Sequence, residues 1–170
     1  MKQYDEAVGK FYKTQTINSL PLASWDLYAT YFKAVCGNFK DIVSLQDIAR
    51  KNRWGHSSEF ETALIKRQSV IVVTDVNLRI VHATNNIIAM SGYQPQEVIG
   101  CLPKVFQGPE TCEKTRKRIR KAVQKRLPFE EILLNYRKDG SVYNCWIKGE
   151  PVHDTNGKLV NFIAYEKEVA

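Results

Sequence analysis

The sequence predicts an α+β fold, in which a helical region precedes a largely antiparallel β-sheet with short helices. Two observations support this prediction. Apolar residues recur every three or four positions up to residue 67, whereas β-branched runs bounded by turn residues dominate from position 68 onward. With 170 residues, 44% of them hydrophobic, the chain can build one ordinary domain and an extension. We therefore expect a helical extension over residues 1–67 and one domain over residues 68–170.

Three helical patterns make up the predicted extension. The first covers residues 24–39, with Ser24 in position to cap it, and the second covers residues 41–52. The third, residues 57–67, opens with a pair of serines, and Ser58 has a glutamate three residues later, the spacing of a capping box. The extension has no evident core of its own. Its apolar faces are expected to pack on the sheet or on a dimer partner.

The domain is predicted to begin with a hairpin, residues 69–75 and 78–84, because two β-branched runs flank a short turn. A short helix then ends at Gly92, and another begins at Pro95, whose fixed φ suits the first helical position. A longer helix over residues 111–126 precedes the remaining strands.

Three further strands are predicted near the end of the chain, over residues 129–138, 141–152 and 158–168. Asp-Gly and Asn-Gly pairs separate them, and these pairs favour tight hairpins because both residues tolerate positive φ. The three strands should therefore form an antiparallel meander.

Charge and cysteine content limit the classes of function. The formal net charge is +7, and the four cysteines are scattered, with no C-x-x-C pair and no histidine at metal-ligand spacing. We expect reduced thiols and no metal site. The first residues lack a signal-peptide pattern, and no stretch is long and apolar enough to span a membrane, so we expect a soluble, cytoplasmic protein. No hydrolase, kinase, P-loop or zinc-protease motif is found, and we expect that the chain is not an enzyme.

Several spaced motifs after position 68 resemble those of PAS sensor domains. They are the T-D after the first strand, S-G-Y-x-x-x-E-V-I-G, N-Y-R-K-D-G-S at the first late hairpin and P-V-x-D-x-x-G-K before the last strand. The resemblance implies a five-stranded antiparallel sheet in the order 2-1-5-4-3, with flanking helices. It also implies that any ligand lies in a cavity between the sheet and the helices.

Residues 92–108, with the Pro-Glu-Thr that follows, resemble the flavin-binding branch of PAS domains, the light-oxygen-voltage (LOV) photoreceptors. The motif of that branch, G-x-N-C-R-F-L-Q-G, carries the photoactive cysteine. In this chain the cysteine position falls on Pro103, which has no nucleophile. The resemblance therefore implies a LOV-like scaffold that lacks the cysteine needed for adduct photochemistry.

The same resemblance implies which residues would line a ligand-binding pocket. Thr74, Gln107, Arg120 and Asn135 keep the residue types of that branch at flavin-contacting positions, and Lys104 replaces a phosphate-binding arginine. Leu102, Cys145 and Glu166 replace the other polar contacts, so a flavin ring would lose most of the neutral amides that both donate and accept hydrogen bonds. The candidate ligand-binding residues are Thr74, Lys104, Gln107, Arg120, Asn135, Cys145, Phe162 and Glu166.

These substitutions leave the identity of the ligand undecided. FMN is the best single candidate cofactor, whereas haem is disfavoured because residues 110–127 contain no histidine. Cys112 and Cys145 are interpreted as small apolar fillers. Trp146 is expected on the outer face of the sheet, where the helical extension or a second subunit would cover it.

Basic residues surround the helix over residues 111–126, leaving a narrow apolar arc. A solvated surface, an acidic protein partner and nucleic acid are the alternatives, and the absence of a helix-turn-helix frame argues against DNA.

The sequence thus favours a freestanding PAS sensory module that acts through a small ligand or through dimer contacts and passes its state to a separate signalling protein. A homodimer through the N-terminal helices or the outer sheet face is expected. A non-covalent flavin-binding light or redox sensor and a basic adaptor that binds an acidic protein or nucleic acid are the alternatives.

Overall fold

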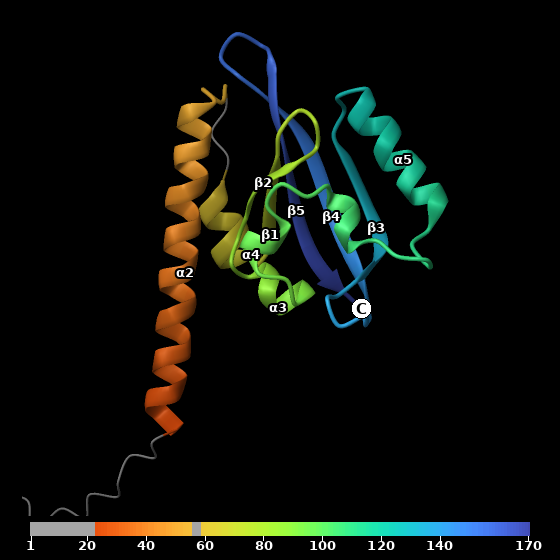
Figure 1. Ribbon diagram of the computed structural model, residues 1–170. Helices are drawn as coiled ribbons and strands as arrows, with labels where there is room; N and C mark the ends of the chain where they lie inside the picture. Colours follow the sequence, from red (N-terminus) through yellow and green to blue (C-terminus); the bar gives the residue numbers. More distant parts are fainter. Residues whose placement is uncertain (1–22, 56–58) are drawn as a thin grey trace, which may run out of the picture. The chain divides into compact units, whose positions relative to one another are not determined.

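The computed structural model describes the backbone of residues 23–55 and 59–170 and the side chains of residues 36–55 and 59–170. The chain divides into two compact units, Met1–Cys36 and Gly37–Ala170. The second unit contains the whole sheet (Figure 1). The predicted domain boundary between residues 67 and 68 stays a prediction.

The sheet has five strands in the order β2-β1-β5-β4-β3, which confirms the predicted α+β fold and strand order. All the neighbouring strands pair antiparallel. The strands are β1 (Val70–Thr74), β2 (Ile80–Ala83), β3 (Phe129–Tyr136), β4 (Val142–His153) and β5 (Leu159–Val169).

Both late hairpins form where the sequence predicts them. Gly140 and Gly157 lie at φ of 87° and 79°, a left-handed conformation that glycine adopts without a steric penalty. The first turn lets β3 and β4 pair from Phe129↔Gly149 to Tyr136↔Val142. Local turn chemistry therefore sets the register of β3, β4 and β5.

The inner face of the sheet is covered by helices from the middle of the chain. These are α3 (Ile87–Ser91), α4 (Pro95–Val98), the 3-10 helix η2 (Pro103–Phe106) and α5 (Glu113–Gln124). Figure 1 shows α5 running alongside β3. Side chains from β1, β2, α3, α4, η2 and β4 form one buried apolar cluster on this side.

The first two predicted helices form a single helix, α2 (Ala23–Lys51), so the predicted break near residue 40 and the predicted cap at Ser24 are wrong. The cause lies at Gly37. Glycine within a helix costs only about 1 kcal/mol relative to alanine, too little to end a helix that continues on both sides. The third predicted helix is a short π-helix, η1 (Thr62–Lys66), and the serines predicted to cap it lie outside the described residues.

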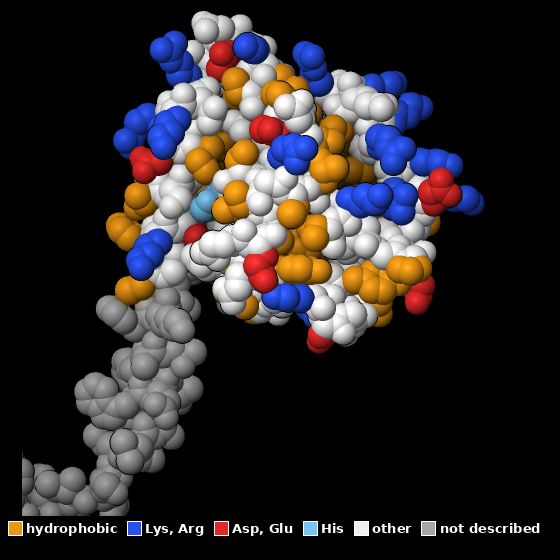
Figure 2. Space-filling view, viewed as in Figure 1, with side chains coloured by type: hydrophobic (Ala, Val, Ile, Leu, Met, Phe, Trp, Pro, Cys, Tyr) orange, Lys and Arg blue, Asp and Glu red, His pale blue; other side chains and the backbone are white. Residues whose placement is uncertain are grey.

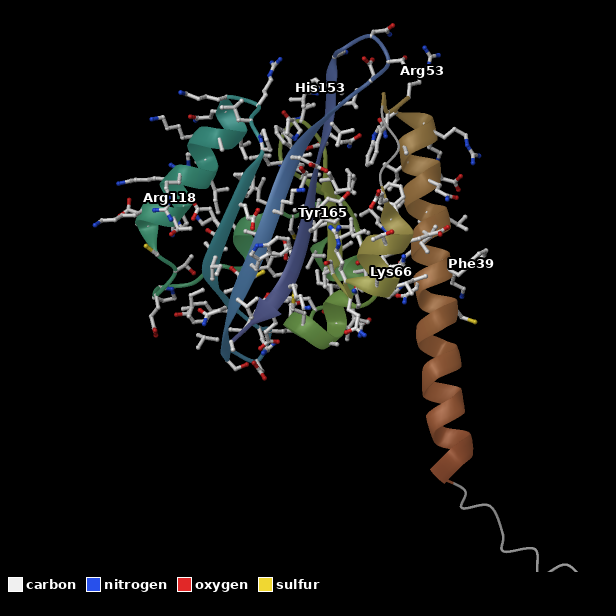
Figure 3. The ribbon with its side chains drawn as sticks, turned by 180° about the vertical axis from the view of Figure 1, so that it is seen from behind. Phe39, Arg53, Lys66, Arg118, His153 and Tyr165 are labelled. Carbon is white, nitrogen blue, oxygen red and sulfur yellow. The ribbon has the colours of Figure 1, made fainter. Side chains whose placement is uncertain are left out.

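The outer face of the sheet packs against residues from Gly37 to η1. Ile42, Leu45, Trp54, Phe60 and Leu64 join a second buried cluster with side chains of β1, β4 and β5. Figure 3 looks onto this side, with Tyr165 labelled on β5. This segment therefore packs on the sheet, one of the two arrangements expected of the extension.

A buried carboxylate holds this part of α2 beside the start of α3. Asp41 is 3% exposed and accepts hydrogen bonds from the backbone N–H of Asn85 at 2.8 Å and from its side-chain Nδ2 at 2.9 Å. Burial raises the pKa of the Asp41 carboxyl, although the two hydrogen bonds from Asn85 oppose this change.

A second polar contact crosses from the segment after α2 to the sheet. Trp54 Nε1 donates to Asn161 Oδ1 at 2.9 Å, and Asn161 Nδ2 donates to the backbone carbonyl of Thr74 at 3.0 Å. Trp54 and Asn161 are both buried. The chain of hydrogen bonds therefore links Trp54 to the end of β1.

Trp146 lies on the outer face of β4, as predicted, but it is not part of the cluster that the extension covers. It is half-buried, and its Nε1 donates to a carboxylate oxygen of Glu130 at 2.9 Å. Nearby on the same face, Ile132 is 56% exposed. Within the described part of the chain, the outer face of β3 and β4 therefore presents apolar side chains to solvent.

Trp54→Phe should lower the free energy of unfolding by about 1–3 kcal/mol, because the buried Asn161 Oδ1 loses its donor. Chemical denaturation monitored by circular dichroism would measure the loss. Trp146→Phe is the matched control, since it removes an indole donor from an exposed contact and should cost less than about 1 kcal/mol. Equal losses in the two variants would contradict this role of Trp54.

Candidate ligand-binding site

A cavity of about 500 Å³ lies between the inner face of the sheet, η2 and α5. Strands β1, β3, β4 and β5 supply its floor and walls, and side chains of η2 and α5 supply its rim. The volume falls within the range typical of small-molecule sites. Most of the lining residues are apolar, and the polar ones lie at the rim and the floor.

The structure brings together all but one of the predicted ligand-binding residues. Those that line the cavity are Thr74, Lys104, Gln107, Arg120, Asn135, Phe162 and Glu166. Cys145 does not line it, but its thiol lies 3.8 Å from the carboxylate of Glu166. Whether these residues bind a ligand stays a prediction.

Strand alternation explains why these side chains converge. Thr74 on β1 lies opposite Phe162 on β5, and Ile147 on β4 lies opposite Glu166 on β5. Cross-strand partners share one face of a sheet, and residues two apart on one strand share it as well. Phe162 and Glu166 are four residues apart, so both face the cavity.

Glu166 is a buried acidic residue on the cavity floor. Its carboxylate is buried, and the Cys145 thiol is its one side-chain hydrogen-bond donor among the described residues. Burial raises the pKa of Glu166 to about 7, a shift that the hydrogen bond from Cys145 opposes. Burial also raises the pKa of the Cys145 thiol, and the neighbouring carboxylate adds to that rise. Cys145 is therefore a protonated thiol at neutral pH.

Two other polar atoms of the floor have no hydrogen-bond partner among the described residues. They are Thr74 Oγ1 and Asn135 Oδ1, on residues that are 6% and 4% exposed. Buried polar atoms are rarely left unpaired in folded proteins. Their position on the cavity floor means that a ligand could satisfy both atoms.

The rim is basic. Lys104 on η2 and Arg116 and Arg120 on α5 line the cavity, and none of them takes part in a salt bridge within the described residues. Figure 2 shows Lys and Arg side chains gathered over α5. Arginine can hold a phosphate through two parallel hydrogen bonds, whereas lysine acts as a point charge. The rim could therefore hold the anionic end of a ligand.

Arg116 and Phe129 line the cavity but were not predicted to do so. Arg116 lies three and four residues before Ile119 and Arg120, which also line the cavity, but this spacing does not fix which side of α5 faces the sheet. Phe129 lies opposite Gly149, where any Cβ would meet the phenyl ring at 2.4 Å. A glycine in mid-strand is a sign of such close packing.

The cysteines lie away from the cavity lining throughout the described residues, and Pro103 occupies part of the rim. The interpretation of Cys112 as an apolar filler is wrong, because Cys112 is exposed at the start of α5. Cys145 is buried, as predicted. Over the described residues, no group of three or more His, Cys, Asp and Glu side chains could hold a metal ion.

Among the helices that the structure describes, none combines the length and apolar character needed to cross a membrane.

Glu166→Gln should raise the stability of the ligand-free protein, and more so at higher pH. The pKa of Glu166 rises from 4.5 to about 7 on folding, so between these values the folded state binds more protons and stability falls as pH rises. At about 1.4 kcal/mol per pKa unit, the variant should gain up to about 3 kcal/mol over wild type between pH 4 and pH 8. Urea unfolding at both pH values measures this gain. The exposed control Glu110→Gln should show no comparable pH dependence, and an equal gain in the two variants would refute the assignment.

Comparison with known proteins finds relatives that include two at 37% and 38% identity. Phototropin-2 of Oryza sativa subsp. japonica is 37% identical over 117 residues, which are 67% of this chain and 13% of that protein. Protein TWIN LOV 1 of Arabidopsis thaliana is 38% identical over 92 residues, 54% of this chain and 23% of that protein. The chain therefore spans less than a quarter of the length of these relatives.

Solved structures similar to this chain include LOV domains. A LOV domain studied with a flavin analogue has 30% sequence identity and a TM-score of 0.62, over 67% of this chain and 87% of that one. The dark structure of the Aureochrome1 LOV domain has 29% identity and a TM-score of 0.61, over 68% and 86%. The family model for the PAS domain matches residues 67–169. The chain therefore belongs to the PAS domain family and is similar to the LOV domains within it.

Proposed function

We propose that this chain is a sensory signalling module whose state is set by a small ligand in the cavity, with FMN as the first candidate. The cavity itself carries this proposal, because apolar walls separate a basic rim from a floor whose polar atoms include two that have no hydrogen-bond partner in the described part of the chain. Such a pocket suits an elongated ligand with an anionic group at one end and a polar head at the other. The relatives are sensory domains, which supports a sensory role.

The phosphate and the ring system of FMN suit this arrangement of charged and apolar side chains. Its phosphate would lie at the rim, where Arg120 and Lys104 supply positive charge. Its flat ring system would lie between the apolar walls, and its polar edge would reach Asn135 and Glu166. When bound, a flavin supplies light absorption and reversible electron transfer, while the residues of the chain hold and orient it.

The proposed sensor works without a cysteinyl adduct. Pro103 lies at the rim, where the resemblance to LOV domains would place the photoactive cysteine. The Cys101 thiol instead donates to the backbone carbonyl of Glu97 at 3.6 Å. Cys145 is held as a protonated thiol, which is a poor nucleophile. Signalling would therefore depend on non-covalent binding or on the redox state of the ligand.

We also propose that the module forms a homodimer through the outer face of β3 and β4 and reports to a separate signalling protein. Ile132 and Trp146 face each other across the two strands, and Val142 on the same face is 47% exposed. Apolar side chains gathered on one sheet face favour a protein contact. A ligand that binds one packing arrangement more tightly than another would shift the balance between them.

Arg120→Ala should weaken FMN binding about tenfold and leave riboflavin binding unchanged, because riboflavin lacks the phosphate that Arg120 would hold. Flavin fluorescence titration measures both affinities. Lys117→Ala is the control on the same helix, since Lys117 pairs with Glu113 and does not line the cavity. Equal losses for FMN and riboflavin, or no binding of either, would argue against the proposed phosphate site.

Ile132→Glu should convert a dimer into a monomer, because a charged side chain would have to be buried at the contact. Light scattering coupled to size-exclusion chromatography measures the mass. Ile99→Glu is the control, since Ile99 is 48% exposed and lies after α4, away from this face. A wild-type monomer, or a dimer that persists in the Ile132 variant, would exclude this interface.

A further inference from the structure

The solvent side of α5 carries a row of lysines, which we call the lysine stripe. Its members are spaced three or four residues apart, so they lie on one face of the helix within an arc of about 80°. Figure 2 shows Lys and Arg side chains over α5, and in Figure 3, which labels Arg118, nitrogen-tipped side chains extend from α5 away from the sheet. The stripe consists of four exposed residues on α5 and at its C-terminal end: Lys114, Lys117, Lys121 and Lys125.

The opposite side of α5 belongs to the cavity. Ile119 and Val123 lie about half a turn around the helix from the stripe, and both line the cavity. The apolar side of the helix is therefore turned inward. What α5 presents outward is positive charge without an apolar anchor.

Most of the charge on the stripe is not neutralised by the rest of the described chain. Lys117 pairs with Glu113 at 2.9 Å, but both side chains are 68% exposed, and such surface pairs contribute little. The other three lysines take part in none of the salt bridges among the described residues. The chain has a formal net charge of +7 and a pI of about 9.2. A pI above about 9 together with lysines gathered along one helix is the electrostatic pattern of proteins that bind nucleic acid.

The composition of the stripe distinguishes among anionic partners. Interfaces between proteins are enriched in aromatic residues, methionine and arginine and are poor in lysine. Helices that lie on a bilayer bury an apolar face in the headgroup layer, and the apolar face of α5 is turned to the cavity. Single-stranded nucleic acid is held in part by bases stacked on aromatic rings, and α5 contains none. A duplex needs only cations, because its bases stack on one another and its phosphates face outward.

We propose that the lysine stripe binds the phosphate backbone of duplex nucleic acid without reading its sequence. The stripe extends about 16 Å along the helix, and a duplex carries about ten phosphate charges over that length. Contacts to phosphates do not require a helix in the major groove, so they do not require a helix-turn-helix frame. The inference does not depend on a ligand in the cavity, because the stripe and the cavity lie on opposite sides of α5.

Fluorescence anisotropy with a fluorescein-labelled DNA duplex of about 20 base pairs tests the proposal. Wild-type protein should bind with a dissociation constant of about 10⁻⁵ M in 50 mM NaCl. Binding should be roughly 40-fold weaker in 200 mM NaCl, because contacts to three phosphates give a slope of about −2.7 for the logarithm of the affinity against that of the salt concentration. Two duplexes of unrelated sequence should have dissociation constants within about threefold of each other.

The combined substitutions Lys114→Gln, Lys121→Gln and Lys125→Gln should weaken binding at least tenfold in 50 mM NaCl. They should also remove most of the salt dependence, since each lysine that contacts a phosphate contributes about one unit to the slope. The three side chains are exposed, so circular dichroism should show an unchanged fold.

The matched control combines Lys40→Gln, Lys51→Gln and Lys66→Gln. It removes the same charge from exposed positions on α2 and η1, which pack on the other face of the sheet, and should change binding less than threefold.

Binding that is absent up to about 10⁻⁴ M protein in 50 mM NaCl would overturn the proposal. Equal losses in the two triple variants would also overturn it, because net charge alone would then account for the binding. A preference of more than tenfold for one sequence would exclude the backbone mode. Binding to phosphatidylserine-containing vesicles but not to the duplex would assign the stripe to a membrane surface instead. The wild-type measurements need no variant, so a folding defect cannot obscure them.

Discussion

Strand β1 is buried along its whole length, and this constraint connects the cavity to the helical segments on the other side of the sheet. Val72 and Thr74 face the cavity, whereas Ile71 and Val73 belong to the cluster that packs against the segment from Gly37 to η1. A slip of one residue would exchange the two sets and place a threonine hydroxyl in the outer core. The side chain of Asn161 donates to the carbonyl of Thr74, so the end of the strand is held at the same residue whose hydroxyl faces the cavity.

A buried carboxylate at the other end of the same lining works against stability. Glu166 could be replaced by an amide of nearly the same shape, and the fold would avoid the cost of desolvating a charge. Sites that depart from the most stable choice of residue are often functional sites. In this chain the long pairing of β4 with β5, which continues on both sides of Glu166, holds the residue at the floor despite that cost. Replacement of this carboxylate is therefore compatible with an intact sheet.

The sequence was sufficient to predict the parts of the fold that depend on local chemistry. Alternating apolar residues and the two Asx-Gly turns placed the strands, and the resemblance to PAS domains supplied their order. The continuity of α2 through Gly37 was missed, because two adjacent apolar patterns do not show whether the helix breaks between them, and one glycine costs too little to end it. Likewise, the inward position of Arg116 depends on how α5 docks on β3, and spacing along the chain alone does not fix that rotation. The resemblance to LOV domains placed Glu166 among the candidate pocket residues, whereas the extent of its burial depends on the packed structure.

A ligand can alter the outer face only if it binds one arrangement of that face more tightly than another. Under the proposed function, the shared strands provide the physical connection, because β1 and β5 contribute alternate side chains to the cavity and to the outer cluster. Among the described residues, polar contacts of the outer segment include those of Asp41 with Asn85, of Trp54 with Asn161 and of the Gly55 N–H with the His153 carbonyl. Burial raises the pKa of the Asp41 carboxyl, so part of what its hydrogen bonds contribute is offset by desolvation. A difference of about 1.4 kcal/mol between the ligand's affinities for two arrangements would change their population ratio tenfold. Under the proposed function, the outer segment is therefore joined to the cavity through side chains of the same two strands.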